Sequence, residues 1–276
     1  NPNDITPASA RALRLLGFNR ISIGVQSFDD RVLRFLRRRH NAADARRAIA
    51  AARAAGFENI SIDLMYAVPG QSPAAWMCTL RVAAGFAPEH ISCYQLTIKE
   101  GTPLWRLQES GAVKKLPESE EETFFLSTAA FLEARGYSHY EVSSFARHEN
   151  FYARHNQKYW HHIPYLGLGP AAHSFLDGMR WWNCASVEEY IEALRSGRSP
   201  AAGVEEISAE QMRLETLFLK FRTSRGIERD FFDPYGKSAD ILSRLAAARL
   251  VRIEKERIIP TTQGFLVADG IPRLFL

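Results

Sequence analysis

Short apolar strands follow a glycine and an aromatic residue at several places in the first half of the chain. Residues 16–24 (Leu-Gly-Phe-Asn-Arg-Ile-Ser-Ile-Gly) align with residues 55–63 (Ala-Gly-Phe-Glu-Asn-Ile-Ser-Ile-Asp), and looser copies lie at 85–94 and 136–143. In each copy an amphipathic helix precedes the glycine, which can adopt the positive φ that ends a helix. The β-branched residues that follow favour a strand. The pattern therefore predicts helices and strands in alternation.

Alternating helices and apolar strands predict a parallel sheet in an α/β domain. Thr6-Pro7, Asn41 and Ser72-Pro73 are typical starts of helices, because a capping side chain precedes each one. We expect strands near residues 20–26, 58–65, 90–97 and 138–144. We expect helices near residues 7–16, 29–38, 42–55, 73–85 and 119–135.

The pattern changes in the second half. From about Phe145 to Asp177 the chain is rich in histidine and aromatic residues without clean periodicity, which favours a functional loop region over a linker. Further on we expect helices at 186–197, 208–222 and 237–249, then a hairpin and a last helix capped by Thr261. Helices followed by a hairpin resemble a winged helix. We therefore expect three parts, residues 1–145, 146–200 and 201–276.

Composition narrows the class of protein. The chain has 276 residues, of which 46% are hydrophobic and 24% charged, and this excludes wholesale disorder and a coiled coil. A net charge of +4 is too small to indicate nucleic acid by itself. Three widely spaced cysteines provide neither a disulfide framework nor a metal quartet. No apolar run approaches the length of about 20 residues that a membrane-spanning helix needs. We expect a cytoplasmic protein.

Ligands of parallel α/β sheets gather at the carboxyl ends of the strands. Gln26 ends the first expected strand, and Asp63 interrupts an apolar run in the second. A buried carboxylate is costly without a partner, so Asp63 is either satisfied by nearby loop amides or part of a binding site. The cluster Arg37-Arg38-Arg39 follows a helix, where at least two arginines are expected to be solvated. One of them could turn toward the sheet and bind a carboxylate or phosphate.

A second candidate site lies at residues 154–162, Arg-His-Asn-Gln-Lys-Tyr-Trp-His-His. A histidine close to two large aromatic rings supplies parts that an iron porphyrin needs, a nitrogen ligand and apolar planes. An ordered loop held by aromatic packing accounts for the same composition. The composition favours the ordered loop, and both interpretations stay open at this point.

The chain resembles a known family in several separate motifs. These are Asn1-Pro2, residues 20–28 (Arg-Ile-Ser-Ile-Gly-Val-Gln-Ser-Phe), Arg38 with His40, residues 62–65 (Ile-Asp-Leu-Met) and residues 68–72 (Val-Pro-Gly-Gln-Ser). Together they are similar to the radical S-adenosylmethionine family of oxygen-independent coproporphyrinogen III oxidases. Residues 155–160, His-Asn-Gln-Lys-Tyr-Trp, match the HNxxYW signature of its heme chaperone branch. The resemblance covers essentially the whole chain.

The resemblance implies an α/β fold, a partial (β/α) barrel with a small α+β winged-helix-like C-terminal domain. It implies S-adenosylmethionine held by Gln26, Arg38 and Asp63, with Arg38 at the methionine carboxylate. It also implies a heme motif made by His155, Asn156, Tyr159 and Trp160, with His155 in contact with heme.

The resemblance further implies a 4Fe–4S cluster, yet the CxxxCxxC motif of that cluster is absent from these residues. None of the three cysteines matches its spacing. We therefore expect an N-terminally truncated chain, lacking the first barrel units and with its cluster ligands upstream, and we assign no catalytic or metal-binding residue here.

Three functions follow as hypotheses. The first is a heme chaperone that binds heme and passes it to acceptor proteins. The second is an oxygen-independent coproporphyrinogen III oxidase that decarboxylates two propionates to give protoporphyrinogen IX. The third, a DNA-binding module in the winged unit, is disfavoured because residues 237–249 carry only three basic side chains. The expected partners are heme and heme acceptors without nucleic acid or a transmembrane segment, and association with a membrane surface is left open.

Overall fold

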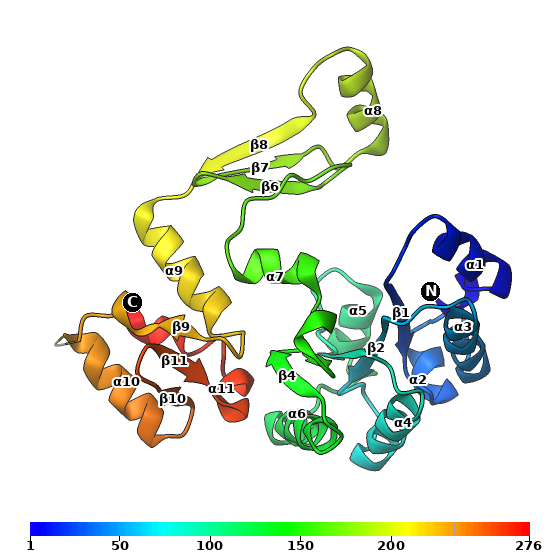
Figure 1. The fold of residues 1–276 in the computed structure, drawn as a ribbon, viewed down its shortest axis with the longest axis horizontal. Coiled ribbons are helices and arrows are strands. Elements are labelled where there is room, and N and C mark those ends of the chain that lie inside the picture. The colour runs from blue at the N-terminus through cyan, green and yellow to red at the C-terminus, as the bar shows by residue number, and fades with distance from the viewer. Residues whose placement is uncertain (235) are drawn as a thin grey trace. The chain divides into compact units, whose positions relative to one another are not determined.

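The computed structural model describes residues 1–234 and 236–276. The chain divides into two compact units, Asn1–Tyr152 and Ala153–Leu276 (Figure 1). Among the residues described, no helix has both the length and the apolar character needed to cross a membrane.

The first unit is built on a five-stranded sheet with the strand order β1-β2-β3-β5-β4. Its strands are β1 (Ile21–Gln26), β2 (Ile60–Tyr66), β3 (His90–Gln95), β4 (Ser138–Glu141) and β5 (Ser144–Ala146). Its helices are α1 (Pro7–Leu15), α2 (Asp30–Phe35), α3 (Ala42–Ala54), α4 (Pro73–Gly85), α5 (Pro103–Glu109) and α6 (Glu118–Glu133). The expected alternation of helix and strand is confirmed, and α5 is an addition that the sequence pattern did not predict.

Local signals set the ends of these helices. Thr6 and Asn41 each form a capping box at the start of α1 and α3, and the hydroxyl of Ser72 caps α4. Gly17 and Gly56 follow α1 and α3 with φ near +90°, so the glycine of the repeat ends each helix as expected. The chain then turns directly into β1 and β2.

The expectation of an all-parallel sheet is wrong at its far end. β1, β2 and β3 are parallel, but β5 pairs antiparallel with both β3 and β4. We expected one strand over residues 138–144. Instead β4 ends at Glu141 and the chain reverses, so that Glu141 pairs with Ser144 of β5. A two-residue connection of this kind joins antiparallel strands, whereas a parallel pair needs a long crossover.

The sheet has an apolar face covered by helices. Ile21, Ile23 and Val25 of β1 are buried, and α3 packs on β1 and β2. The ring of Tyr66 at the end of β2 lies tilted against Trp76 of α4, with centroids 5.6 Å apart, and stacks on Phe124 of α6 at 6.2 Å. This face is the core of the first unit.

The second unit begins with α7 (Arg154–Trp160), which lies in the region expected to be loop. A three-stranded antiparallel sheet follows, made of β6 (His173–Leu176), β7 (Met179–Asn183) and β8 (Ala201–Glu206), with α8 (Val187–Arg195) between β7 and β8. The expected helix at 186–197 is confirmed, but the sheet was not predicted. Trp182 lies so close to Gly203 that a Cβ at that position would enter its ring.

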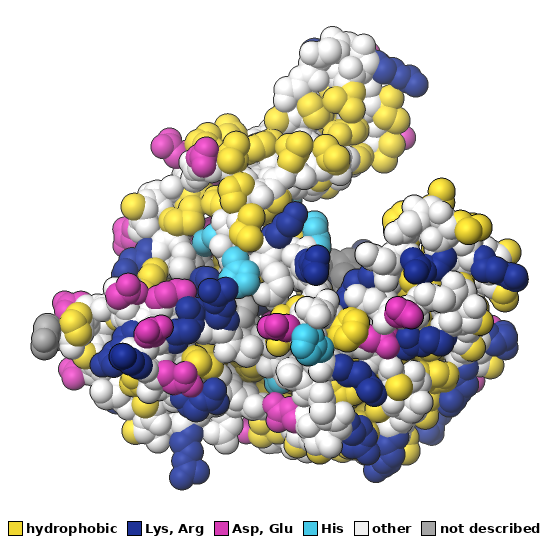
Figure 2. Space-filling model, in the orientation of Figure 1, with side chains coloured by type: hydrophobic (Ala, Val, Ile, Leu, Met, Phe, Trp, Pro, Cys, Tyr) yellow, Lys and Arg dark blue, Asp and Glu magenta, His cyan; other side chains and the backbone are white. Residues whose placement is uncertain are grey.

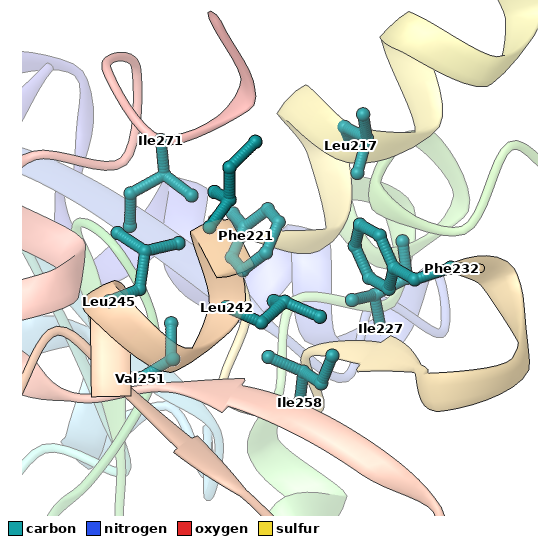
Figure 3. Close-up of a cluster of buried hydrophobic side chains, with 10 residues drawn as sticks. Leu217, Phe221, Ile227, Phe232, Leu242, Leu245, Val251, Ile258 and Ile271 are labelled. Carbon is teal, nitrogen blue, oxygen red and sulfur yellow. The ribbon is translucent and has the colours of Figure 1, made fainter. Parts of the chain in front are cut away.

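The C-terminal part has helices followed by a hairpin and a last short helix, in the order expected from the sequence, around a cluster of buried apolar side chains (Figure 3). It comprises α9 (Ala209–Lys220), β9 (Ile227–Glu228), α10 (Lys237–Ala247), β10 (Val251–Ile253), β11 (Arg257–Pro260) and α11 (Thr262–Leu266). The expected hairpin is β10 with β11, and β9 adds a third strand. Phe221, which is fully buried, belongs to the apolar cluster between α9, α10 and this sheet.

We expect Phe221→Ala to lower the free energy of unfolding by about 3–5 kcal/mol, because it removes a buried ring and leaves a cavity. Urea unfolding followed by circular dichroism measures the change. Leu194→Ala is the matched control, because Leu194 is 52% exposed, and a surface substitution changes stability by about 0.5 kcal/mol or less. Equal effects of the two substitutions would contradict this account of the core.

Candidate functional site

The face of the sheet opposite the helices carries polar side chains. In a strand, residues two apart share a face, so Ser22 and Gly24 of β1 lie together. The register of β1 with β2 shifts between Gly24 and Gln26, and the side chain of Gln26 lies next to Gly24. The parallel register places Gly24 beside Asp63 of β2, and Asp63 beside Ser92 of β3. Three strands therefore bring their polar positions into one row.

Asp63 is held by hydroxyl groups in this row. The hydroxyl of Ser22 lies 3.1 Å and 3.0 Å from the two carboxylate oxygens. Burial raises the pKa of Asp63, while hydrogen bonds from Ser22 and Ser92 and the charge of Arg20 oppose this shift. The carboxylate is thus satisfied by side-chain hydroxyls rather than by the loop amides considered from the sequence.

The end of β1 forms a second polar group. Gln26 has a φ of 64°, unusual for a residue other than glycine. A Cβ on Gly24 would come within 2.9 Å of Gln26 Nε2 and 3.5 Å of Arg38 Nη2. The absence of a side chain at Gly24 therefore leaves the room in which these two polar side chains lie.

Arg38 is directed toward β1 by the way that α2 ends. The amide of Arg37 donates to the carbonyl of Arg34, and the amide of Arg38 to that of Leu33, with Arg37 at φ 52°. These two bonds make a Schellman motif. Arg38 Nη2 then donates to the carbonyl of Gly24 at 3.2 Å, and its buried Nε has no partner among the residues described. Arg37 and Arg39 are exposed, as expected for two of the three arginines.

The buried side chain of His40 stabilises the same strand end. Its Nε2 donates to the carbonyl of Val25 at 2.9 Å, and the side chain is 3% exposed. Burial lowers the pKa of His40, so the neutral ring is favoured. The strand end that presents Gln26 and Arg38 is therefore fixed by a buried contact.

A cavity of about 440 Å³ lies at the carboxyl ends of the strands. Gln26 and Arg38 line it, together with Met65, Thr97 and residues of α5 such as Leu104. Asp63 is not among its lining residues, but is joined to this end of the sheet through its register with Gly24. The structure thus brings Gln26 and Arg38 into one cavity and leaves Asp63 beside it.

Sequence reasoning missed Ser22, Gly24 and Ser92. The period-two alternation of Ile21–Gln26 contained the signal for the first two, because it separates Ser22, Gly24 and Gln26 from the buried Ile and Val positions. The contribution of Ser92 depends on the register between β2 and β3, which the pattern of one strand does not contain.

A buried network crosses the sheet next to this row. Ser61 Oγ lies 2.8 Å from His90 Nδ1, and His90 Nε2 lies 2.7 Å from the hydroxyl of Tyr140. Burial and the charge of Arg20 lower the pKa of His90 to about 3. A neutral His90 can then accept one hydrogen bond and donate the other.

The second candidate motif lies on α7, in the second unit. The hydroxyl of Tyr159 lies 3.0 Å from His155 Nε2, and the two rings meet edge to face with centroids 5.1 Å apart. His155 and Tyr159 are exposed, whereas Asn156 and Trp160 are half-buried. The indole Nε1 of Trp160 is buried without a partner among the residues described. The motif therefore presents an accessible imidazole beside a phenol.

Comparisons of the chain with known proteins identify the family to which it belongs. A model of the Radical SAM superfamily matches residues 1–82. Heme chaperone HemW of Bacillus subtilis (strain 168) is 31% identical over 282 residues, which cover 100% of this chain and 74% of that protein. The chain belongs to the HemW heme chaperone family. HemW of Mycobacterium tuberculosis (strain CDC 1551 / Oshkosh) is also 31% identical, covering 100% of this chain and 70% of that protein.

A solved structure confirms the fold expected for this HemW family member. Coproporphyrinogen III oxidase (HemN) from Escherichia coli, described as a radical SAM enzyme, superimposes with a TM-score of 0.79 over 99% of this chain and 68% of that chain. At 22% identity the likeness establishes the α/β fold alone. The expected resemblance to the radical SAM coproporphyrinogen oxidase group, in its heme chaperone branch, is thus confirmed.

The network around His90 predicts a dependence of stability on pH. The folded-state pKa of about 3 lies below the ordinary histidine value of 6.5. The unfolded state therefore binds more protons between these values, and stability falls as pH falls from 6.5. We expect the stability difference between the native chain and His90→Gln to shrink by up to about 1.4 kcal/mol per pH unit in this range.

Urea unfolding at pH 7.5, 6 and 5 measures that difference. His148→Gln is the control, because His148 is exposed. A difference between the native chain and His90→Gln that stays constant with pH would show that His90 is not buried in the neutral form.

Proposed function

We propose that this chain binds heme at the motif on α7 and passes it to acceptor proteins. The observation that carries the proposal is the exposed imidazole of His155 with Tyr159 at 3.0 Å, within a chain of the HemW heme chaperone family. Histidine nitrogen is a common axial ligand of heme iron. Tyr159 can hold one ring nitrogen while the other is left for the metal, as is usual for metal-ligating histidines.

We also propose that the polar end of the first unit's sheet binds S-adenosylmethionine. Arg38 offers a guanidinium whose buried Nε lacks a partner among the residues described, and such a group suits a carboxylate. Gln26 lies beside it, over the space that Gly24 leaves open. Asp63 supplies a carboxylate held by Ser22 for the polar part of the ligand. These residues fit a zwitterionic nucleoside.

The same residues do not fit an iron–sulfur cluster. Across residues 1–234 and 236–276 no group of three metal-ligating side chains is present. Cys78 lies exposed on α4, Cys93 is buried in β3, and Cys184 belongs to the second unit. In radical S-adenosylmethionine proteins a reduced cluster generates a 5′-deoxyadenosyl radical, and the described residues supply no ligand set for such a cluster. The residues described therefore support binding of heme on α7 and of S-adenosylmethionine at the sheet, without a cluster.

We expect His155→Ala to change heme binding, since the substitution removes the proposed iron ligand. Titration of the chain with heme, followed through the Soret band, should show a shifted band and an affinity about tenfold lower or weaker still. His148→Ala, at an exposed histidine of the first unit, should bind like the native chain. An unchanged Soret response in His155→Ala would refute the assigned role.

For S-adenosylmethionine we compare two neighbouring arginines. Arg38→Gln should lower the affinity about tenfold or more, because a hydrogen bond to a charged group is lost. Arg39→Gln should change it little, since Arg39 is exposed and lies 3.7 Å from Asp4 rather than in the cavity. Equilibrium dialysis with labelled ligand measures both. Equal affinities of the two variants would contradict the placement of the ligand at Arg38.

A further inference from the structure

One side of α7 carries four exposed side chains, Arg154, His155, Lys158 and Tyr159. Residues three and four apart in a helix are neighbours on its surface, so Arg154 lies beside Lys158 and His155 beside Tyr159. The other residues of the helix, Asn156, Gln157 and Trp160, are half-buried. This exposed side, called the α7 face below, thus combines an imidazole, a phenol and two cations.

The cations of the α7 face are available to a ligand. Neither Arg154 nor Lys158 forms an ion pair with any residue in the described part of the chain. By contrast, Arg180 in the same unit is bound to Glu215 at 2.7 Å. The positive charge at Arg154 and Lys158 is therefore not neutralised by the fold.

An apolar segment adjoins this face. The ring of Tyr159 meets that of Tyr165 with centroids 4.7 Å apart and an interplanar angle of 75°. Tyr165 is itself fixed by two backbone hydrogen bonds of 2.9 Å with Phe175 in β6. Beyond it, Leu166 is 69% exposed and Leu168 is 80% exposed. Figure 2 shows apolar side chains gathered over the region of β6–β8 and α8. Large apolar side chains exposed together mark a binding surface.

Heme has three parts with different chemistry: a central iron, a flat apolar ring, and two propionate carboxylates on one edge of the ring. We propose that Arg154 and Lys158 receive the two propionates while Leu166 and Leu168 border the ring, an assignment that rests on the heme binding proposed above. Each part of heme then meets a matching group, since His155 faces the iron. Lysine and arginine are suited to carboxylates through charge-assisted hydrogen bonds.

The proposal assigns a specificity. A porphyrin with free carboxylates should bind more tightly than one whose carboxylates are esterified, because an ester has no charge to pair with the two cations. Both cations are exposed, so salt should weaken the preference. The iron contact is the same for both ligands, and the preference therefore reports on Arg154 and Lys158 rather than on His155.

The experiment compares the affinities of the chain for heme and for heme dimethyl ester, in the same buffer with a low concentration of neutral detergent. We expect the native chain to prefer heme about tenfold, given two exposed charge-assisted contacts. In the double variant Arg154→Gln with Lys158→Gln the preference should fall to about twofold or less, with little change in ester affinity. The matched control is Arg195→Gln with Arg198→Gln, two exposed cations at the end of α8, which should keep the native preference.

The apolar part is tested separately. Leu166→Gln should lower the affinities for heme and for its dimethyl ester by the same factor, about threefold to tenfold, because the porphyrin ring is common to both ligands. Leu15→Gln, at a leucine of the first unit that is 89% exposed, should change neither affinity. Circular dichroism of each variant without ligand verifies that the fold is retained.

Several results would overturn the inference. These are an equal affinity of the native chain for the two ligands, an unchanged preference in the Arg154 and Lys158 double variant, and an equal loss of both affinities in that variant. Failure of the proposed heme ligand is distinguishable, since it is read from the Soret band of His155→Ala, where the preference for free carboxylates should persist.

Discussion

The register of the three parallel strands is the constraint on which the polar site of the first unit depends. Gly24, Asp63 and Ser92 occupy neighbouring positions because β1, β2 and β3 align there, and the apolar residues of the same strands face the helices. A shift of one residue in any pairing would send that polar row into the core. The strong burial of Ile23, Ile62 and Ile91 therefore fixes the place of the polar side chains on the opposite face as well.

The first unit shows how far sequence reasoning reaches. The repeated Gly and aromatic pair predicted β1, β2 and β3 within about two residues, because helix ends and apolar strands have local signals. The same pattern failed at Glu141, where a tight turn reverses the chain, since turn geometry decided the direction and not periodicity. Short elements such as α5 and β5 gave little periodic signal over so few residues.

The same distinction between local signals and three-dimensional contacts applies to the candidate sites. Gln26 and Arg38 were proposed from strand ends and family motifs, and they line one cavity, but the role of Gly24 depends on side-chain approach in three dimensions. In the second unit the HNxxYW residues were identified as a motif, whereas their helix was expected to be loop. The three-stranded sheet β6–β8 was not predicted, because its strands expose residues on both faces. Apolar and polar positions therefore do not alternate along them.

The termination of α2 has a consequence for how this region can change in evolution. A left-handed Arg37 ends the helix and sends the next residue toward β1. Each residue added to a helix turns the following side chain by about 100°. Insertion or deletion of a single residue in Asp30–Phe35 would rotate the following residues by this angle and turn the guanidinium of Arg38 away from β1. The length of this short helix therefore sets the direction of the Arg38 side chain. The residue count of α2 is therefore constrained as strictly as the contact that Asp30 makes with the start of α3, where its carboxylate accepts from the amide of Ala42.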